Sequence, residues 1–442
     1  MLRNSLFFLL FIGLSACSSK NNEYKAYLEN PDLYAATVHE LNTVVMGNNF
    51  PPMVASRNYA YAAVAAYEVV AAFQPNEYQS LAGQLNELKP IKNYAIEAKA
   101  NMALTALLAY MKVGEAVTFP EGSLQLYRDS IIEIAKEKGL SNSELAASVK
   151  IADSIGNAII RWSKSDHYAE TRSAEKYTVI DTPGRWIPTP PMYASATEPH
   201  WNKIRPMALL AANQFMPPKP IPFDIKNTKS EYYQQVIAVK NAVDSLTPEQ
   251  KHIAEFWDDN PFKLNVVGHV MFGNKKFSPG GHWMSVVGIA AKKANANFST
   301  TVMAYAQTAI ALFDAFIQCW DVKYQYNTVR PETVINKYFD VNWRPYLQTP
   351  AFPEYTCGHS TISASAAEAL TNVFGDNFSY TDTTELEFGI KSRSFTSFRH
   401  AALENNLARF YGGIHFHPSC LVSTNQGKLI GEWVVKKLVM KK

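Results

Sequence analysis

Four long stretches rich in Ala, Leu and Ile limit the folds open to this chain more than any other feature. They span residues 56–73, 95–113, 145–164 and 285–320. Their apolar residues recur every three to four positions, which is the spacing of one face of an α-helix. Strand-like alternation is scarce. With 442 residues, 47% of them hydrophobic, the chain can bury a large core, so we expect an all-α fold built from helical bundles.

Two proline-rich segments interrupt the helical pattern, at residues 181–201 and 215–224. Both contain too many prolines for a regular helix or a central strand. Long ordered loops usually line a site or brace neighbouring elements. We therefore expect long proline-rich loops between the helices, and the sequence has no internal repeat of fixed period.

The N-terminus resembles a bacterial lipoprotein signal. Arg3 precedes an apolar run over residues 6–14, and Cys17 follows shortly afterwards. This run is too short to span a membrane stably, and its pattern is that of a secretory signal. The pattern predicts that residues 1–16 are removed, that Cys17 is lipidated, and that residues 17–30 tether the chain to a membrane of the bacterial cell envelope, at the outer membrane or the periplasmic face. An ordinary signal peptide that happens to contain a cysteine is the alternative.

Charge and cysteine content exclude two broad classes. The formal net charge is +3, from 42 basic and 39 acidic residues without a long run of one sign, so nothing favours general nucleic-acid binding. The cysteines that remain after Cys17 are Cys319, Cys357 and Cys420. Three thiols are too few, and odd in number, for a disulfide framework in a chain of this size. Any recognition of anions must be local.

Candidate anion-binding residues gather in the last third of the chain. Lys323 and Arg330 are seven residues apart, which is two turns of a helix, so we expect them along one helical face. A solvated basic face is the alternative. Further on, Gly358 and His359 stand where a loop turns into an Ala/Ser-rich helix, and the free amides of a helix N-terminus bind anions well. Ser360 as a plain helix cap, with His359 as a polar loop residue, is the alternative there.

Arg409 and His415 supply a third segment, on either side of the Gly412-Gly413 pair. The planar fork of arginine donates in parallel to two oxygens of an oxyanion. A neutral imidazole can be a nucleophile or a metal ligand, and a protonated one can be an acid. The three segments together could enclose one tetrahedral oxyanion.

Together these residues resemble the signature of the type 2 phosphatidic acid phosphatase and vanadium haloperoxidase superfamily, which reads Lys-x6-Arg-Pro, Pro-Ser-Gly-His and Ser-Arg-x5-His-x3-Asp. The matching segments are Lys323-x6-Arg330-Pro331, Cys357-Gly358-His359 and Arg409-x5-His415. Residues 50–68, 183–207 and 278–283 are similar to the soluble, vanadium-haloperoxidase-like branch. The resemblance implies an all-helical fold of four-helix bundles. We expect an N-terminal helical part over residues 31–284 and a C-terminal catalytic part over residues 285–442.

The resemblance also implies a role for each matching residue. The groups that would bind the equatorial oxygens of the oxyanion are Lys323, Arg330, Arg409 and the amide of Gly358. His415 would ligate vanadium in a haloperoxidase, whereas in a phosphatase it would attack phosphorus and become a transient phosphohistidine. His359 would be the acid or base that protonates peroxide or the leaving alkoxide. The implied cofactor is vanadate, or none in a phosphatase, because vanadate and phosphate are both tetrahedral oxyanions that can become five-coordinate.

Residues around the signature carry further implied roles. Asp259, or equally its neighbour Asp258, resembles a carboxylate that orients one of the cations. Trp320 and Phe352 resemble the apolar wall beside the site in chloride-oxidising members, although core packing would explain both aromatics equally well. His417 could be an extra acid or base, and we expect it at the surface.

Cys357, Ala408 and Ser419 depart from the family pattern. Cys357 replaces the usual serine, and a thiol is a weaker hydrogen-bond donor to the oxyanion as well as a group open to oxidation by peroxide. Ala408 replaces the serine before Arg409. Ser419 stands where an aspartate would orient His415, so that the imidazole needs another partner.

The sequence therefore leaves three functions open. The first is a membrane-tethered haloperoxidase that oxidises halide with hydrogen peroxide, and the second is an acid phosphatase of the same fold. The third is a lipoprotein that binds an oxyanion without catalysis. A lipid phosphatase is disfavoured because no span of membrane length is evident after the signal. Small molecules are the expected substrates, and a lipid anchor is the expected contact with a membrane.

Overall fold

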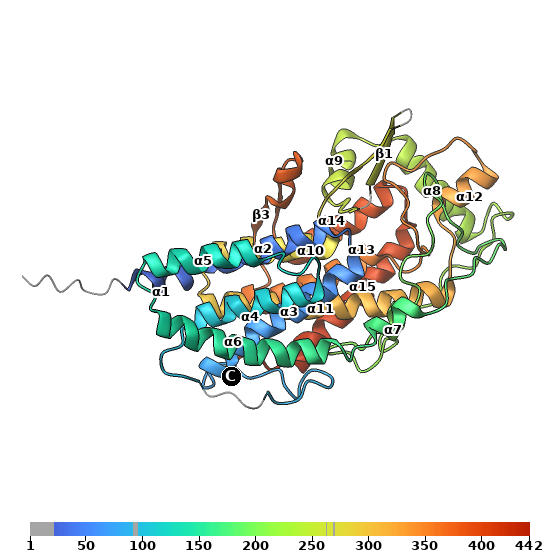
Figure 1. The fold of residues 1–442 in the computed structure, drawn as a ribbon. Helices are drawn as coiled ribbons and strands as arrows, with labels where there is room; N and C mark the ends of the chain where they lie inside the picture. Colours follow the sequence, from blue (N-terminus) through green and yellow to red (C-terminus); the bar gives the residue numbers. More distant parts are fainter. Residues whose placement is uncertain (1–21, 92–95, 262, 268–269) are drawn as a thin grey trace, which may run out of the picture.

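Helices form nearly all of the regular structure, as the periodicity predicts (Figure 1). The computed structural model describes residues 22–91, 96–261, 263–267 and 270–442. The predicted signal peptide and Cys17 lie outside the described residues. The described residues form fifteen α-helices, two short 3-10 helices and two small two-stranded sheets. The all-α prediction is confirmed.

The first half of the chain forms seven helices and then a long irregular stretch. The helices are α1 (Glu23–Leu28), α2 (Pro31–Gly47), α3 (Pro52–Phe73), α4 (Met102–Val117), α5 (Gln125–Glu137), α6 (Asn142–Ser163) and α7 (Tyr168–Ser173). Helix α1 falls within the predicted tether. The irregular stretch carries both proline-rich segments and the short helix η1 (Trp201–Lys203). It is followed by α8 (Glu231–Asp244), α9 (Pro248–Phe256) and the antiparallel hairpin of β1 (Lys263–Val267) and β2 (Val270–Asn274).

The second half carries the residues of the predicted signature. Its elements are α10 (Pro279–Lys293), α11 (Phe298–Tyr326), α12 (Pro331–Tyr338), α13 (Gly358–Phe374), β3 (Tyr380–Asp382), η2 (Thr384–Phe388), β4 (Arg393–Phe395), α14 (Phe398–Tyr411) and α15 (His417–Lys437). Strands β3 and β4 pair in an antiparallel manner.

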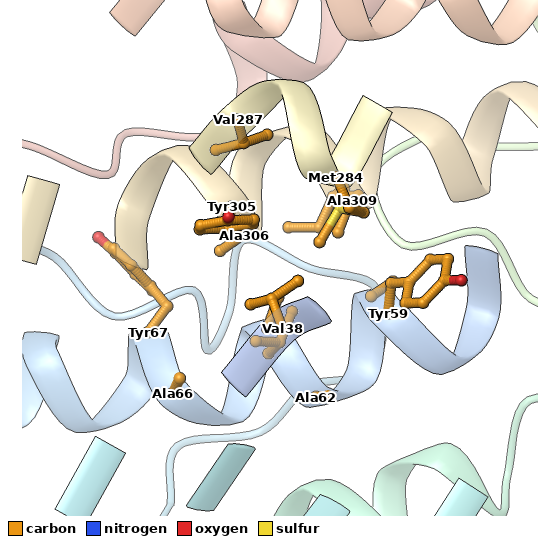
Figure 2. Packing of buried hydrophobic residues seen from close by; sticks show 14 of the residues in the cluster. Val38, Tyr59, Ala62, Ala66, Tyr67, Met284, Val287, Tyr305, Ala306 and Ala309 are labelled. Atoms are coloured by element: carbon orange, nitrogen blue, oxygen red, sulfur yellow. The ribbon is translucent and has the colours of Figure 1, made fainter. Parts of the chain in front are cut away.

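Helices α3 and α11 form the centre of the bundle. Residues 53–71 of α3 and 301–320 of α11 are all buried, as expected for helices that are apolar on every side. Figure 2 shows side chains of four helices meeting in this core: Val38 from α2, Tyr59 and Tyr67 from α3, Met284 from α10, and Tyr305 and Ala309 from α11.

Helix α11 is long and apolar enough to cross a membrane, which differs from our expectation that no such segment follows the signal. Its apolar window is 100% buried inside the protein. The position of α11 in the core of the bundle therefore accounts for its composition.

The stretch 285–320, predicted as one helix, is two helices. Asn295 adopts a left-handed conformation with φ 49°, and the side chain of Asn297 accepts a hydrogen bond from the Thr300 backbone N–H to cap α11. Asparagine tolerates the left-handed region and is among the best helix caps. These two residues end α10 and start α11, so the prediction of a continuous helix is wrong.

A buried carboxylate fixes the proline-rich stretch to the central helix. Asp314 of α11 accepts hydrogen bonds of 2.7 Å from the backbone N–H groups of Met207, Ala208 and Leu209. Burial raises the pKa of Asp314 to about 6, while the three N–H groups act in the opposite direction. The stretch between α7 and α8 is thus held firmly against the bundle.

Helices α13 and α15 pack with their backbones in close contact. A Cβ atom at Gly427 of α15 would lie 2.0 Å from the carbonyl oxygen of Thr361, and one at Gly431 would lie 2.6 Å from that of Ser365. Only glycine permits this approach. It brings the N-terminal ends of α13 and α15, which carry predicted site residues, into one region.

Candidate active site

Lys323 and Arg330 converge on one loop, although they do not share a helix. Helix α11 ends at Tyr326, and Asn327 stops it in a left-handed conformation with φ 51°. Arg330 is extended and precedes the first residue of α12, so the prediction of a shared helical face is wrong. The ammonium of Lys323 donates to the carbonyl oxygens of Pro353 and Glu354, at 2.8 and 3.0 Å.

The guanidinium of Arg330 is held by the backbone on two sides. Its Nε donates to the carbonyl oxygen of Phe352 at 2.8 Å, and its Nη1 donates to that of Ile414 at 2.8 Å. Arg330 and Lys323 are both 0% exposed. These bonds fix the direction of the two cations before any ligand binds.

The N-terminus of α13 supplies the second predicted segment. Gly358 is the first residue of the helix, and Cys357 precedes it with extended backbone angles. The Cys357 backbone N–H donates to Ser423 Oγ of α15 at 2.7 Å. The backbone N–H groups of the first turn therefore stand at a helix end beside α15, where an anion is favoured.

The turn between α14 and α15 supplies the third segment. Arg409 lies in the last turn of α14, and Gly413 then adopts φ 75°. A Cβ atom on Gly413 would lie 2.7 Å from Val243 Cγ2, so both the backbone angle and the close approach require glycine there. The turn places His415 Nε2 3.0 Å from Arg330 Nη1.

Glu354 orients His415, and the sequence reasoning missed it. His415 Nδ1 lies 2.8 Å from Glu354 Oε1, and both side chains are buried. Because arginine can only donate, Nε2 of His415 accepts from Arg330, so that Nδ1 carries the proton and donates it to Glu354. Ser419, at the position of the family's aspartate, has no partner for its hydroxyl among the described residues. A glutamate three residues before Cys357 was the available signal.

Several buried polar atoms around His415 have no hydrogen-bond partner within the described part of the protein. They are Arg330 Nη2, Arg409 Nε, His359 Nε2 and Ser360 Oγ. A buried donor left unsatisfied costs about 1–3 kcal/mol, and such groups are rare in native proteins. Two of them belong to guanidinium groups. The donor set therefore fits a bound tetrahedral oxyanion such as vanadate.

Arg409 is positioned by the segment that follows α9. Its Nη1 donates to the carbonyl oxygens of Trp257 at 2.7 Å and Asp258 at 3.3 Å. Asp259 lies beside this contact, but its carboxylate oxygen is 2.9 Å from His282 Nδ1. The segment thus supports Arg409 through main-chain carbonyl groups.

Comparisons with known proteins agree with an oxyanion site of the haloperoxidase type. A family model for the second helical-bundle domain of VCPO matches residues 303–342 and 339–441. The solved structure of a bacterial vanadium-dependent iodoperoxidase is similar to this chain with a TM-score of 0.87 and 42% sequence identity, over 93% of this chain and 97% of that one. The chain belongs to the vanadium-dependent haloperoxidase family. It is a haloperoxidase-like enzyme.

More distant structures share the fold of this haloperoxidase. The holo form of a bacterial vanadium-dependent chloroperoxidase has a TM-score of 0.65 at 18% identity, covering 88% of this chain and 92% of that one. The apo form of a bacterial vanadium-dependent chloroperoxidase has a TM-score of 0.66 at 16% identity, covering 88% and 94%. No curated protein matches the chain.

Burial and mutual repulsion shift the pKa values of the haloperoxidase site. Burial lowers the pKa of Lys323 to about 8, and the charge of Arg330 acts in the same direction. Burial likewise lowers the pKa of Arg330 to about 10, with a smaller contribution from Arg409. Burial, followed by the charge of Arg409, holds the pKa of His359 well below its usual range. An anion would relieve this repulsion.

Cys357 experiences the same positive field. Burial by itself raises the pKa of its thiol, but a hydrogen bond with Cys420 and the neighbouring His415 and Arg409 together hold that pKa well below the ordinary value. Cys319, Cys357 and Cys420 are all buried and free. The departure from serine thus places a thiol beside His415.

Trp320 and Phe352 form an apolar wall over the two cations. Their ring centroids are 4.9 Å apart, and the Phe352 centroid lies 5.0 Å from both Lys323 Nζ and Arg330 Cζ. Trp320 Nε1 also donates to the carbonyl oxygen of Thr197 at 3.1 Å. The two aromatics therefore both pack in the core and flank the site, where cation–π attraction favours the positive charges.

A cavity of about 340 Å³ reaches the site from the side of the proline-rich stretch. Its wall includes the segment 189–192 together with Phe352, His359 and Arg409. This volume is ample for peroxide and halide. His417, in contrast, is half-buried and lines a separate depression with Phe410 and Pro418.

Proposed function

We propose that this enzyme oxidises iodide, and other halides to a lesser extent, with hydrogen peroxide at a vanadate ion bound beside His415. The observation that carries the proposal is the set of unpartnered buried donors that surround His415 in a cationic pocket. The 42% identity with a bacterial vanadium-dependent iodoperoxidase supports iodide as the first halide to test.

The oxygens of the ion would be held by charges that the fold has already oriented. The proposed donors are Lys323, Arg330, Arg409, the Gly358 amide and, when its thiol is protonated, Cys357. Because the backbone holds the first two in place, little reorganisation accompanies binding, which is the condition under which electrostatic stabilisation is strongest. When bound, vanadate supplies a Lewis-acidic centre that activates hydrogen peroxide toward attack by halide.

The two histidines take different roles. Glu354 keeps the proton of His415 on Nδ1, so that Nε2 carries a lone pair. In this structure the lone pair accepts from Arg330, and it would face the central atom of a bound ion. His359 is neutral at ordinary pH because its pKa is held low. Its Nε2 accepts a proton from the incoming peroxide and returns it during the reaction. Trp320 and Phe352 exclude bulk water from the cations.

The test measures two activities on the same samples. The enzyme is stripped of oxyanions and titrated with orthovanadate, while iodide and bromide oxidation by hydrogen peroxide and hydrolysis of an aryl phosphate are recorded. The proposal expects halide oxidation that rises and saturates with vanadate, with iodide preferred, and that is lost in His415→Ala.

Two other outcomes would contradict the proposal. Phosphate hydrolysis that falls as vanadate is added, without halide oxidation, would establish an acid phosphatase. Silence in both assays, with vanadate still bound, would establish an oxyanion-binding protein without this catalysis.

We assign the catalytic part to residues 285–442 and the N-terminal helical part to residues 31–284. The signature residues all belong to the first of these segments. The two parts pack closely through α3 and α11. Expression of residues 285–442 alone therefore tests whether the catalytic part folds without the other. A soluble, folded fragment would support separable domains, and an insoluble one would contradict them.

We further propose that Cys17 is lipidated and anchors the enzyme in the bacterial cell envelope. The apolar run before this cysteine supports the proposal. The test is detergent phase partitioning of the full-length protein expressed in bacteria, with Cys17→Ala as the control. The wild type should enter the detergent phase and the variant should not; equal partitioning of both would contradict lipidation.

A further inference from the structure

Four buried ionisable side chains form a cluster behind the segment that supports Arg409. They are Asp259, His282, Asp382 and Glu385, and each is at most 1% exposed. They come from four separate places: the turn after α9, helix α10, strand β3 and helix η2. The fold therefore builds this cluster from parts that are far apart in the sequence.

His282 lies at the centre of the cluster. Its Nδ1 is 2.9 Å from Asp259 Oδ1 and 3.7 Å from Glu385 Oε1. Its Nε2 is 3.0 Å from Asp382 Oδ2. One ring nitrogen thus faces two carboxylates, and the other faces a third.

The charges in the cluster do not balance when His282 is neutral, which is the form that binds a metal. Lys276 Nζ, 2.9 Å from Glu385 Oε2, is the ammonium group paired with it. Three carboxylates against this one ammonium leave two negative charges when the imidazole is neutral. Uncompensated buried charge is costly, and one divalent cation would remove the excess.

Two oxygens in the cluster also lack a donor. Asp259 Oδ2 and Glu385 Oε1 are buried and have no hydrogen-bond partner within the described residues. A carboxylate oxygen that is out of contact with water needs a donor or a cation. These two atoms belong to the same two residues that face His282 Nδ1.

We propose that Asp259, His282 and Glu385 bind a divalent transition-metal cation. Their ligating atoms all lie within 4.8 Å of one another, which is compatible with a shared ion. A donor set of one imidazole nitrogen and carboxylate oxygens suits zinc or manganese(II). Asp382 accepts a hydrogen bond from Nε2–H of His282, and a carboxylate in this position fixes the ring of a metal-bound histidine.

The cation would stabilise the part of the active site that holds Arg409. The ring of Trp257 stacks on His282 with a centroid distance of 4.6 Å and an interplanar angle of 19°. The carbonyl oxygens of Trp257 and Asp258 accept from Arg409. The ion is thus structural, and it is separate from the vanadate site, where the protein supplies positive charge instead of negative.

The experiment measures metal content directly. The purified enzyme is incubated with zinc or manganese(II), desalted, and analysed by inductively coupled plasma mass spectrometry. Its Tm is recorded before and after treatment with a chelator, and again after the metal is restored. The variants are Glu385→Gln, which removes one proposed ligand at constant size, and Asp382→Asn. The matched control is Glu368→Gln, a buried carboxylate that pairs with Arg399 outside the cluster.

We expect about one ion per chain in the wild type and in Glu368→Gln, and no retained ion in Glu385→Gln. Asp382→Asn should weaken the affinity about 10- to 100-fold. The chelator should lower the Tm of the wild type, and adding back the metal that the enzyme retained should restore it. A wild type that retains neither zinc nor manganese(II), and whose Tm does not change with the chelator, would overturn the proposal. The cluster would then be a protonated His282 between carboxylates. Retention by Glu385→Gln at the wild-type level would also overturn it.

Discussion

Glu354 decides which nitrogen of His415 carries the proton. Arg409 and His415 could be predicted because they stand at a fixed spacing within one short segment. Glu354 could not, because its contact with His415 spans 61 residues, and no local spacing encodes a contact of that range. The sequence did indicate the gap, since Ser419 stands where an aspartate was expected. In the fold, Glu354 from another loop takes the place of that aspartate as the partner of His415.

The first prediction concerns this contact. Glu354→Gln replaces the acceptor for His415 Nδ1–H with a neutral amide that can also donate, so the imidazole loses its fixed tautomer. We expect the affinity for vanadate to fall about 10- to 100-fold, as for other residues that orient a metal ligand. Isothermal titration of the stripped enzyme measures the change. Wild-type affinity in Glu354→Gln, with Glu368→Gln as the matched control, would show that Glu354 has no orienting role.

The second prediction concerns the pH dependence of vanadate binding. The pKa of Lys323 is lowered from 10.5 to about 8 by burial, so the ammonium is present below about pH 8 and is lost above it. Because the anion binds the charged ammonium, deprotonation of Lys323 should lower the affinity for vanadate about tenfold for each pH unit above 8. In Lys323→Met the overall affinity should be weaker and this contribution absent. Vanadate itself also ionises, but this affects the wild type and Lys323→Met equally, so the difference between their pH profiles reports on Lys323. Profiles of identical shape would contradict the assignment of this pH dependence to Lys323.

Helix ends, more than helix interiors, place the site. Gly358 begins α13, Arg409 lies in the last turn of α14, and His415 lies in the turn before α15. The periodicity predicted the helices, but it did not predict that Asn327 would stop α11 before Arg330. The spacing of Lys323 and Arg330 therefore picked out two residues that contact the same loop, and it was wrong as a statement about helical faces. A seven-residue spacing cannot distinguish two helical turns from a turn and an extended segment.

The third prediction concerns the contact of α13 with α15. Gly427→Ala would place a Cβ atom 2.0 Å from the Thr361 carbonyl oxygen, so one backbone must shift. Overpacking of this kind costs about 1–3 kcal/mol, and we expect the upper end because backbone atoms are involved. Urea unfolding measures the loss. Gly47→Ala is the matched control, since nothing lies within 4 Å of its added Cβ; equal stability of both variants would refute the close packing.

At the scale of the whole molecule, the described part of the bundle buries Lys323, Arg330 and Arg409 close together, where a bound oxyanion would offset their charge. The all-α class could be predicted from periodicity alone, and helices that are apolar on every side must lie in a core. The order in which α3, α11, α13 and α15 pack did not follow, because it depends on small residues such as Gly427 that permit close approach. The location of the Asp259–His282–Glu385 cluster was likewise hidden, because its members come from separate elements.

The fourth prediction is that oxyanions stabilise the folded enzyme. Binding to the native state alone stabilises it by about 2.7 kcal/mol at a ligand concentration of 100 times Kd. Orthovanadate and, at higher concentration, phosphate should therefore raise the Tm of the stripped protein in calorimetry. Chloride at equal ionic strength is the control for screening. A Tm that responds equally to all three salts would indicate that no specific oxyanion site exists.

The most direct test of the account is a calorimetric titration of the stripped enzyme with orthovanadate, in the wild type, His415→Ala and His417→Ala. His417 lies two residues from His415 but lines a separate depression, so it controls for loss of an imidazole at this end of α15. The account predicts binding of one ion per chain in the wild type and His417→Ala, and affinity at least about 100-fold lower in His415→Ala. Equal affinity in all three proteins would contradict the central claim that His415 and its surrounding donors form the vanadate site.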